Sequence, residues 1–291
     1  MYYPLAQQEF ESYLNGYDRE NDRIKLKIIH TYGVVKQAEE LAGRMHLSAE
    51  DTDLARLIAL LHDIGRFEQL KRYDSFEPGT MDHAAYGVKV LFDEGMIRRF
   101  LPDDKWDSII YTAIAHHSDY ELPEISDPQT LLHAKLIRDE DKLDNCRVKL
   151  VDSTSTFINV SEEELGTQNI TQKVYETVFK NKCILSADRV TQMDYWVSYI
   201  VYFFDINFKE SFDIIAENEK YLLFVEVKTR RAGSMVPGEA AVTAQKQQKL
   251  RFTAESYLLE HPTDRQPRFD VAALSVEGDK LLGFTYYKFA F

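Results

Sequence analysis

The sequence predicts a mainly α-helical fold over residues 1–209, followed by a small α+β unit over residues 210–291. Two observations lead to this prediction. From Asp22 to about Phe208, apolar residues recur at spacings of three and four, which is the period of an amphipathic helix. From Phe212 onward, short runs rich in β-branched and aromatic residues alternate with turn-forming residues, which is typical of strands.

The elements are expected in the following order. Helices are expected over residues 24–45, 51–62, 83–94, 105–117, 129–143 and 189–204. In the second part, FDIIA and YLLFVEVKT are expected to pair as a β-hairpin around the turn AENEK. A helix is expected over roughly residues 243–259, and then RFDVAALSV and LLGFTYYKFAF form a second strand pair around EGDK.

Length and charge limit the partners of the chain. With 291 residues and 44% hydrophobic content, the chain can bury at least one full core. Its formal net charge is -13, and about -12 of it precedes Glu210. The first part would therefore repel a long polyanion, whereas a small phosphate ester needs only a local positive site, which bound metal ions supply. A small phosphorylated substrate is favoured, and nucleic acid is expected to bind only through the second part.

Cysteine use and hydropathy indicate the compartment. Cys146 and Cys183 are far apart and lack CxxC spacing, so neither a disulfide framework nor a thiolate zinc site is expected. This pattern fits a reducing cytoplasm. The first residues lack the basic and apolar regions of a signal peptide, and no stretch approaches the roughly 18 to 20 apolar residues of a membrane span. No membrane association is expected.

The histidines of the helical part point to a metal. Five of the eight lie on or beside apolar helical stripes: His30, His62, His83, His116 and His117. A single buried imidazole can be an ordinary core residue with a hydrogen bond, but several of them beside carboxylates call for a shared partner. Imidazole and carboxylate ligands without thiolates suit Fe, Mn, Co, Ni or Zn. We therefore expect a divalent transition metal, with one or two ions per chain.

Residues 20–205 resemble the HD-domain metal-dependent phosphohydrolases, which form a helical bundle with ligands in the order His, His-Asp, Asp. The motifs that carry the resemblance are KIIHTYGVV, LLHDIGRF and RDEDKLDN. The resemblance implies that one metal is bound by His30, His62, Asp63 and Asp141. MDHAAYG and AIAHHSD match the intervening histidines of the subset with two metals, which implies a second ion held by His83 and His116, with His117 as a further candidate ligand.

Such a site implies attack of metal-activated water on a small phosphate ester, which is expected to be nucleotide-like. Asp63 would orient the water, and Arg66 and Lys142 would neutralise charge on the phosphoryl group. Arg66 could instead be a surface cation at a helix end, and Lys142 could pair with a neighbouring aspartate. Asn145 could contact the substrate or cap a helix end.

Two other functions fit the same ligand order. The HD-fold di-iron oxygenases bind O₂ and cleave C–C or C–P bonds, and the order of ligands does not separate them from hydrolases. A regulatory protein that a metal stabilises without turnover is the other alternative, and its melting temperature would rise with metal while phosphate esters stayed intact.

The second part carries another candidate site. If the hairpin turn spans Glu217 to Lys220, strand alternation places Asp213 on one face with Glu226 and Lys228. Two acids and a lysine form the PD-(D/E)xK nuclease pattern, in which the carboxylates hold Mg²⁺. Residues 210–275 resemble the YraN-like restriction-endonuclease-fold family, which implies the same three residues and Gln247 of the KQ helix.

This second resemblance is incomplete. An acid expected at the second position is replaced by Ser211, and the first helix and strand of the family are missing upstream. The segment could therefore be a degenerate domain kept for packing, dimerisation or weak contact with nucleic acid. It could also make the chain a nucleic-acid-processing protein, with phosphate contacts from its basic residues Lys228, Arg230, Arg231, Lys246, Lys249 and Arg251.

Overall fold

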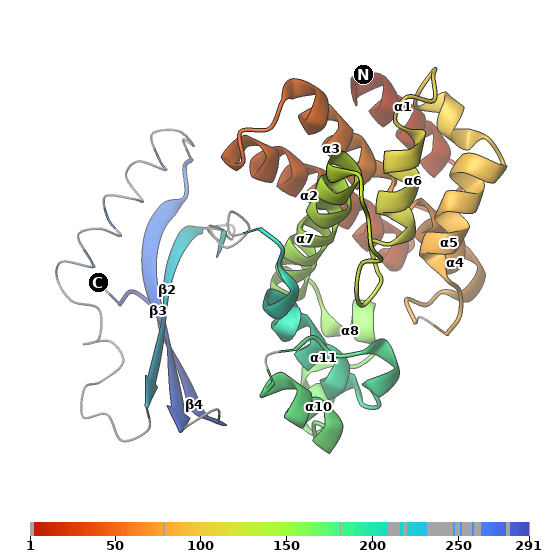
Figure 1. The fold of residues 1–291 in the computed structure, drawn as a ribbon. Helices are drawn as coiled ribbons and strands as arrows, with labels where there is room; N and C mark the ends of the chain where they lie inside the picture. Colours follow the sequence, from red (N-terminus) through yellow and green to blue (C-terminus); the bar gives the residue numbers. More distant parts are fainter. Residues whose placement is uncertain are drawn as a thin grey trace. The chain divides into compact units, whose positions relative to one another are not determined.

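The computed structural model describes residues 3–77, 79–180, 182–208, 216–217, 220–231, 263–277 and 280–290, together with Gln247, Arg251 and Leu258. The chain divides into two compact units, Met1–Phe212 and Asp213–Phe291. The first unit is helical and the second holds a small sheet (Figure 1). The predicted fold class, a mainly α region followed by a small α+β region, is confirmed. The predicted domain boundary between residues 209 and 210 stays a prediction.

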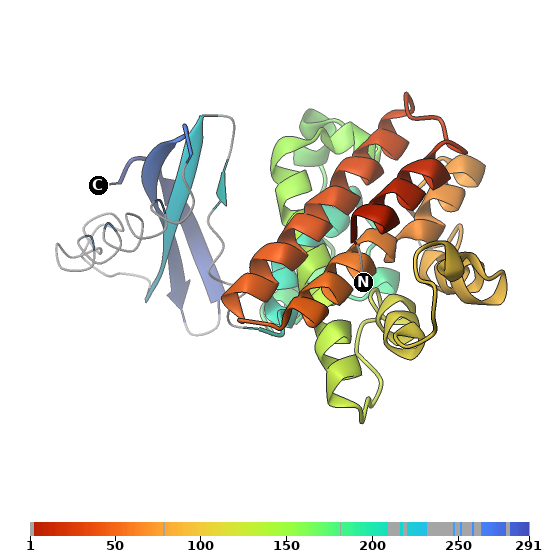
Figure 2. The same cartoon turned by 90° about the horizontal axis from the view of Figure 1, so that it is seen from above.

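The helical unit is built around two long helices, Asp22–Arg44 and Pro128–Val151. Its first elements are α1 (Tyr3–Leu14), α2 (Asp22–Arg44), α3 (Ala49–Leu61), α4 (Ile64–Tyr73), α5 (His83–Val88), the π-helical turn η1 (Lys89–Asp93), the 3-10 turn η2 (Met96–Arg99), α6 (Asp107–Ala115) and α7 (Pro128–Val151). Helix α2 packs against α3 and α7, and α6 packs against α7 (Figures 1 and 2). The main hydrophobic core lies between these helices.

Local sequence explains where the long helices begin. Asn21 precedes α2, and its side chain accepts hydrogen bonds from the backbone N–H groups of Arg23 and Ile24. Asp127 caps α7 in the same way, and proline follows as the first helical residue, where its missing N–H group costs nothing. These caps fix the start of the two helices that carry the first and last predicted metal ligands.

A second layer of short elements lies against the carboxyl half of α7 (Figure 1). It contains α8 (Thr154–Ile158), α9 (Glu162–Gly166), α10 (Gln172–Val178), the 3-10 turn η3 (Ser186–Asp188), α11 (Gln192–Ile200) and the 3-10 turn η4 (Val201–Asp205). Capping boxes at Ser161 and Thr191 begin α9 and α11. Helix α11 contacts α7, α8 and α9, so this layer is held on the bundle through α11.

The predicted helices differ from the observed ones mainly at their ends. Helix α7 runs to Val151, eight residues beyond the expected end, because its second half presents polar residues to a cavity and so loses the apolar period. Helix α6 ends at Ala115 rather than residue 117, and residues 189–204 divide into α11 and η4.

In the C-terminal unit, the strands are β1 (Ala216–Glu217), β2 (Tyr221–Arg231), β3 (Gln266–Glu277) and β4 (Lys280–Tyr287), in the order β1-β2-β3-β4. The expected β3–β4 pair is antiparallel, and so is the short β1–β2 pair. The parallel pairing of β2 with β3 was not expected from the sequence. Gln247, Arg251 and Leu258 have helical backbone, and the other residues of the expected helix 243–259 lie outside the described residues, as do residues 212–215 of the expected first strand.

Candidate metal centre

His30 of α2 is held in place by side chains of the long helix α7. It lies on the buried face of α2, and only 4% of its surface is exposed. Its Nδ1–H donates to Asp144 Oδ2 at 2.7 Å, and its Nε2 lies 3.0 Å from Asp141 Oδ1. Both aspartates belong to α7, so the packing of α2 on α7 brings the first and last predicted ligands together. A carboxylate on the far ring nitrogen fixes the imidazole and leaves Nε2 for a metal.

His62 and Asp63 lie at the junction between α3 and α4. The backbone leaves the helical region at Asp63, with φ -111° and ψ 23°, and α4 begins at the next residue. His62 is fully buried, and its Nδ1–H donates to the carbonyl oxygen of Ala59 at 2.7 Å. The ring therefore presents Nε2 toward Asp63 Oδ2, at 3.2 Å, and Asp141 Oδ1, at 3.7 Å.

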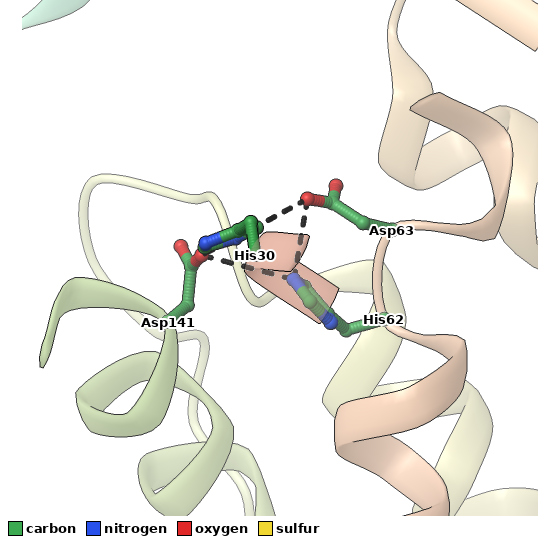
Figure 3. A group of neighbouring side chains, drawn as sticks. All are labelled: His30, His62, Asp63 and Asp141. Carbon is green, nitrogen blue, oxygen red and sulfur yellow. Dashed lines mark hydrogen bonds and ion pairs between the residues drawn. The ribbon is translucent and has the colours of Figure 1, made fainter. Parts of the chain in front are cut away.

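The four predicted ligands of the first metal form one cluster. Figure 3 shows His30, His62, Asp63 and Asp141 turned toward a common point. Each of them offers one ligand atom, and these atoms all lie within 4.8 Å of one another. We name this set the first ligand group.

Asp63 also belongs to a second cluster. Its Oδ2 faces the first ligand group, whereas its Oδ1 lies 3.2 Å from His83 Nε2 and 3.6 Å from His117 Nε2. Asp63, His83 and His117 again offer ligand atoms within 4.8 Å of one another, and all three are buried. We name this set the second ligand group. One carboxylate thus joins two sets of ligands through its two oxygens.

The structure does not bring His116 into either ligand group. The resemblance implies a ligand role for His116, and a helix continued from Ile109 and Ala113 would keep His116 on their apolar face. Helix α6 ends at Ala115, however, and the turn that follows rotates the next two residues away from that spacing. His116 Nδ1 instead lies 2.6 Å from Asp119 Oδ2, while His117 Nδ1–H donates to the Ile114 carbonyl and aims Nε2 at Asp63. His117 takes the place predicted for His116.

The protonation of the two groups suits a metal. Burial lowers the pKa of His62 to about 3 and also lowers the pKa of His83 and His117, so these rings are neutral at pH 7. Burial alone would raise the pKa of Asp141, but the His30 and His62 imidazoles beside it hold it well below its usual value. His62 Nε2 and Asp63 Oδ1 are buried atoms without a hydrogen-bond partner in the described part of the chain. Such orphaned atoms are costly unless a ligand satisfies them, and a divalent cation fits both.

Two residues of the centre were missed in the sequence. Lys27 is buried one turn before His30 on α2, and its ammonium group forms an ion pair with Asp63 Oδ2. Asp144, which is fully buried, receives the His30 Nδ1–H and also two hydrogen bonds from Arg147. Helical spacing could have found both, since Lys27 precedes His30 by three residues and Asp144 follows Asp141 by three.

The predicted substrate residues lie around the two groups. Arg66 Nη2 donates to His83 Nε2 at 2.8 Å, and its Nη1 donates to Gln69 at 2.6 Å. Lys142 pairs with Asp205 rather than with a neighbouring aspartate of its own helix. Asn145 Nδ2 donates to the carbonyl oxygen of Asp141 at 3.0 Å and to its Oδ1 at 2.9 Å, so it supports a predicted ligand.

Arg66, Lys142 and Asn145 border one cavity of about 550 Å³ in the helical unit, together with His30, Asp63, His83, His117 and Asp141. The ligand groups form one end. The second layer supplies the opposite wall, with aromatic side chains that include Phe157, Tyr195, Tyr199 and Tyr202. A cavity of this size accommodates a ligand of nucleotide size.

The predicted nuclease-like site cannot be assembled from the described residues alone. Glu226 and Lys228 lie two residues apart in β2, where they pair in register with Val271 and Ala273 of β3. Gln247 has helical backbone, and Asp213 lies outside the described residues. The Mg²⁺ site stays a prediction.

Comparison with known families confirms both resemblances. Residues 28–146 match the family described as HD domain. HD domains in general are metal-dependent phosphohydrolases that bind divalent metals, and the buried histidines and aspartates described above could hold such an ion.

Residues 200–274 match the uncharacterised protein family UPF0102, the YraN-like family. The UPF0102 protein of Syntrophotalea carbinolica is 48% identical over 69 residues, which are 23% of this chain and 56% of that protein. The UPF0102 protein of Pelobacter propionicus is 46% identical over 68 residues, 22% of this chain and 49% of that protein. The chain thus spans about half the length of these relatives. No solved structure matches the chain.

No helix among the described residues is both long and apolar enough to cross a membrane.

Proposed function

We propose that the helical unit hydrolyses a small, nucleotide-like phosphate ester with the help of divalent metal ions. The observation that carries this proposal is the position of Asp63, whose two oxygens face two separate groups of buried ligands. A carboxylate placed in this way can be shared by a pair of metal ions. The cavity beside it offers room for a substrate of nucleotide size.

The two ligand groups would hold the metals. His30, His62, Asp63 and Asp141 would bind the first ion, and Asp63, His83 and His117 the second. When bound, such ions supply Lewis acidity, which activates water and neutralises charge on the phosphoryl oxygens.

The chain's own residues would orient the reactants. Asp63 would accept a hydrogen bond from the attacking water, because its carboxylate lies between the two ligand groups. Arg66 donates to His83 Nε2, and it would turn its guanidinium toward the phosphoryl group once that lone pair is engaged. Lys142 is fixed by Asp205 at the cavity wall, where its charge would attract the anionic substrate.

Asp63→Asn tests the proposal, since it preserves shape and removes the charge that both groups share. We expect bound metal to fall and hydrolysis of p-nitrophenyl phosphate to drop by at least about 100-fold. Asp74→Asn is the matched control, because Asp74 is exposed and has a left-handed backbone that asparagine accepts. Full activity in Asp63→Asn, with elemental analysis showing unchanged metal, would refute the proposal.

Two alternatives keep some support. The second ligand group also permits a di-iron oxygenase, which would need iron and O₂. The UPF0102 match fits a nuclease-like activity in the C-terminal unit. If that activity exists, Glu226→Ala abolishes cleavage of DNA in Mg²⁺ and leaves phosphatase activity unchanged. If the wild-type chain cleaves no DNA, the C-terminal unit is a binding or packing module.

A further inference from the structure

One end of the cavity contains positive charge that forms no ion pair with the described residues. Six lysines and arginines border the cavity among the residues that the structure describes. Four of them pair with Asp63 or Asp205: Lys27, Arg66, Arg138 and Lys142. Within the same described part of the chain, Lys149 and Arg189 make no ion pair. Both are only partly exposed, so water compensates their charge incompletely.

Lys149 lies on the same face of α7 as the metal centre. Asp141, Asn145 and Lys149 follow one another at intervals of four residues, and all three border the cavity. Eight residues of helix separate the first from the last, which is about 12 Å along the axis. The helix therefore presents a carboxylate, an amide and an ammonium group along one wall of the cavity.

Aromatic rings hold this ammonium group in place. Lys149 Nζ lies 4.0 Å from the ring centroid of Phe157 and 4.4 Å from that of Tyr199. Burial lowers the pKa of Lys149 to about 8, although Asp141 and Asp152 oppose this, so the charged form is only partly compensated. An anion that contacts Lys149 would complete the compensation.

Arg189 lies over a different ring of the second layer, that of Tyr195. Its guanidinium lies 4.5 Å from the Tyr195 ring centroid, and its Nη1 donates to Ser198 Oγ at 3.4 Å, next to Tyr199 in the chain. The hydroxyl groups of Tyr199 and Tyr202 make no hydrogen bond with other described residues and border the cavity. This end of the cavity thus offers two cations, two hydroxyl groups and aromatic faces.

We propose that Lys149 and Arg189 form a second anion subsite, which binds a phosphate of the substrate other than the one that is cleaved. The substrate class is then a nucleotide with at least two phosphates at separate positions, whose aromatic base packs on the tyrosine rings. This inference rests on the proposed function only in assuming that another phosphate of the same substrate is cleaved at the metal centre.

The test compares adenosine 3′,5′-bisphosphate with adenosine 5′-monophosphate by calorimetric titration of the metal-loaded, full-length chain, with turnover followed in parallel. The variants are Lys149→Met and Arg189→Met, which remove charge and keep side-chain length. Lys173→Met is the matched control, because Lys173 is an exposed lysine of the same layer that does not border the cavity.

We expect the wild type to bind the bisphosphate at least about 10-fold more tightly than the monophosphate, and each cavity variant to lose about 10- to 100-fold in bisphosphate affinity. Turnover of p-nitrophenyl phosphate, which lacks a second anion, stays within about twofold of wild type in all variants. Equal affinity of the wild type for the two nucleotides, or unchanged bisphosphate affinity in both cavity variants, overturns the subsite. An equal loss of p-nitrophenyl phosphate turnover also overturns it, because the residues would then serve the fold. A wild type that binds as expected and hydrolyses no phosphate ester contradicts the proposed function and leaves the subsite supported.

Discussion

Replacing Gly33 with alanine tests the close approach of α2 and α7 that holds His30. A methyl group at Gly33 would lie 1.9 Å from Asp144 Oδ1 and 2.4 Å from Asp144 Cγ. The Asp144 carboxylate is fully buried and receives hydrogen bonds from His30 and Arg147, so it can yield only by breaking them. The substitution therefore displaces the carboxylate that orients His30, a predicted metal ligand.

The magnitude follows from two opposing terms. Loss of a hydrogen bond to a buried charged group costs about 1.5 to 3 kcal/mol. Alanine in place of glycine within a helix raises the free energy of unfolding by about 1 kcal/mol. We expect Gly33→Ala to lower the free energy of unfolding by about 0.5 to 2 kcal/mol, and to weaken metal binding by about 10- to 100-fold because the imidazole loses its orienting carboxylate.

Gly43 provides the matched control in the same helix. A methyl group there meets no atom within 4 Å, so Gly43→Ala should raise the free energy of unfolding by about 0.5 to 1 kcal/mol. Urea unfolding of the metal-free chain, followed by helical circular dichroism, measures both variants, and metal titration measures affinity. If Gly33→Ala stabilises the chain as much as Gly43→Ala does, the packing described for Asp144 is wrong.

Further predictions concern the histidines. His117→Ala should remove one bound metal ion per chain and His116→Ala none, as measured by elemental analysis; the reverse result would restore His116 as the ligand. Burial lowers the pKa of His133 in the fold below its unfolded value of 6.5, although Asp51 opposes this. Its stabilising contribution is therefore complete above about pH 6.5 and is lost as the pH falls. Unfolding free energies measured between pH 7 and pH 5 should fall more steeply in the wild type than in His133→Gln, and identical slopes would contradict the assignment.

The sequence predicted much of the metal centre because its ligands lie on long helices. His30 and Asp141 lie within α2 and α7, and His62 ends the apolar face of α3, so helical period alone aimed them inward. The structure does not place His116 with the ligand groups, because its direction depends on the last turn of α6. Helix ends are set by capping and packing rather than by period, and one residue of difference rotates a side chain by about 100°.

Other features carry a weaker signal in the sequence. Helical spacing groups Lys27 with His30 and Asp144 with Asp141, but the partners that hold these charges inside the bundle lie on distant helices. The short helices of the second layer span too few turns for a clear period, so the cavity wall that they form was not foreseen. Lys149 was not foreseen because it lies beyond the expected end of α7. In the C-terminal unit, alternation predicted strands, but it carries no information on the parallel pairing of β2 and β3.

Phosphate release by the manganese-loaded chain in the absence of oxygen tests the central claim most directly. The proposed hydrolysis consumes water alone, so release from nucleotide substrates should proceed at the same rate with and without O₂, and Asp63→Asn should abolish it. Absence of phosphate release under both conditions, or release that requires iron and O₂, would contradict the assignment of this centre to phosphate ester hydrolysis.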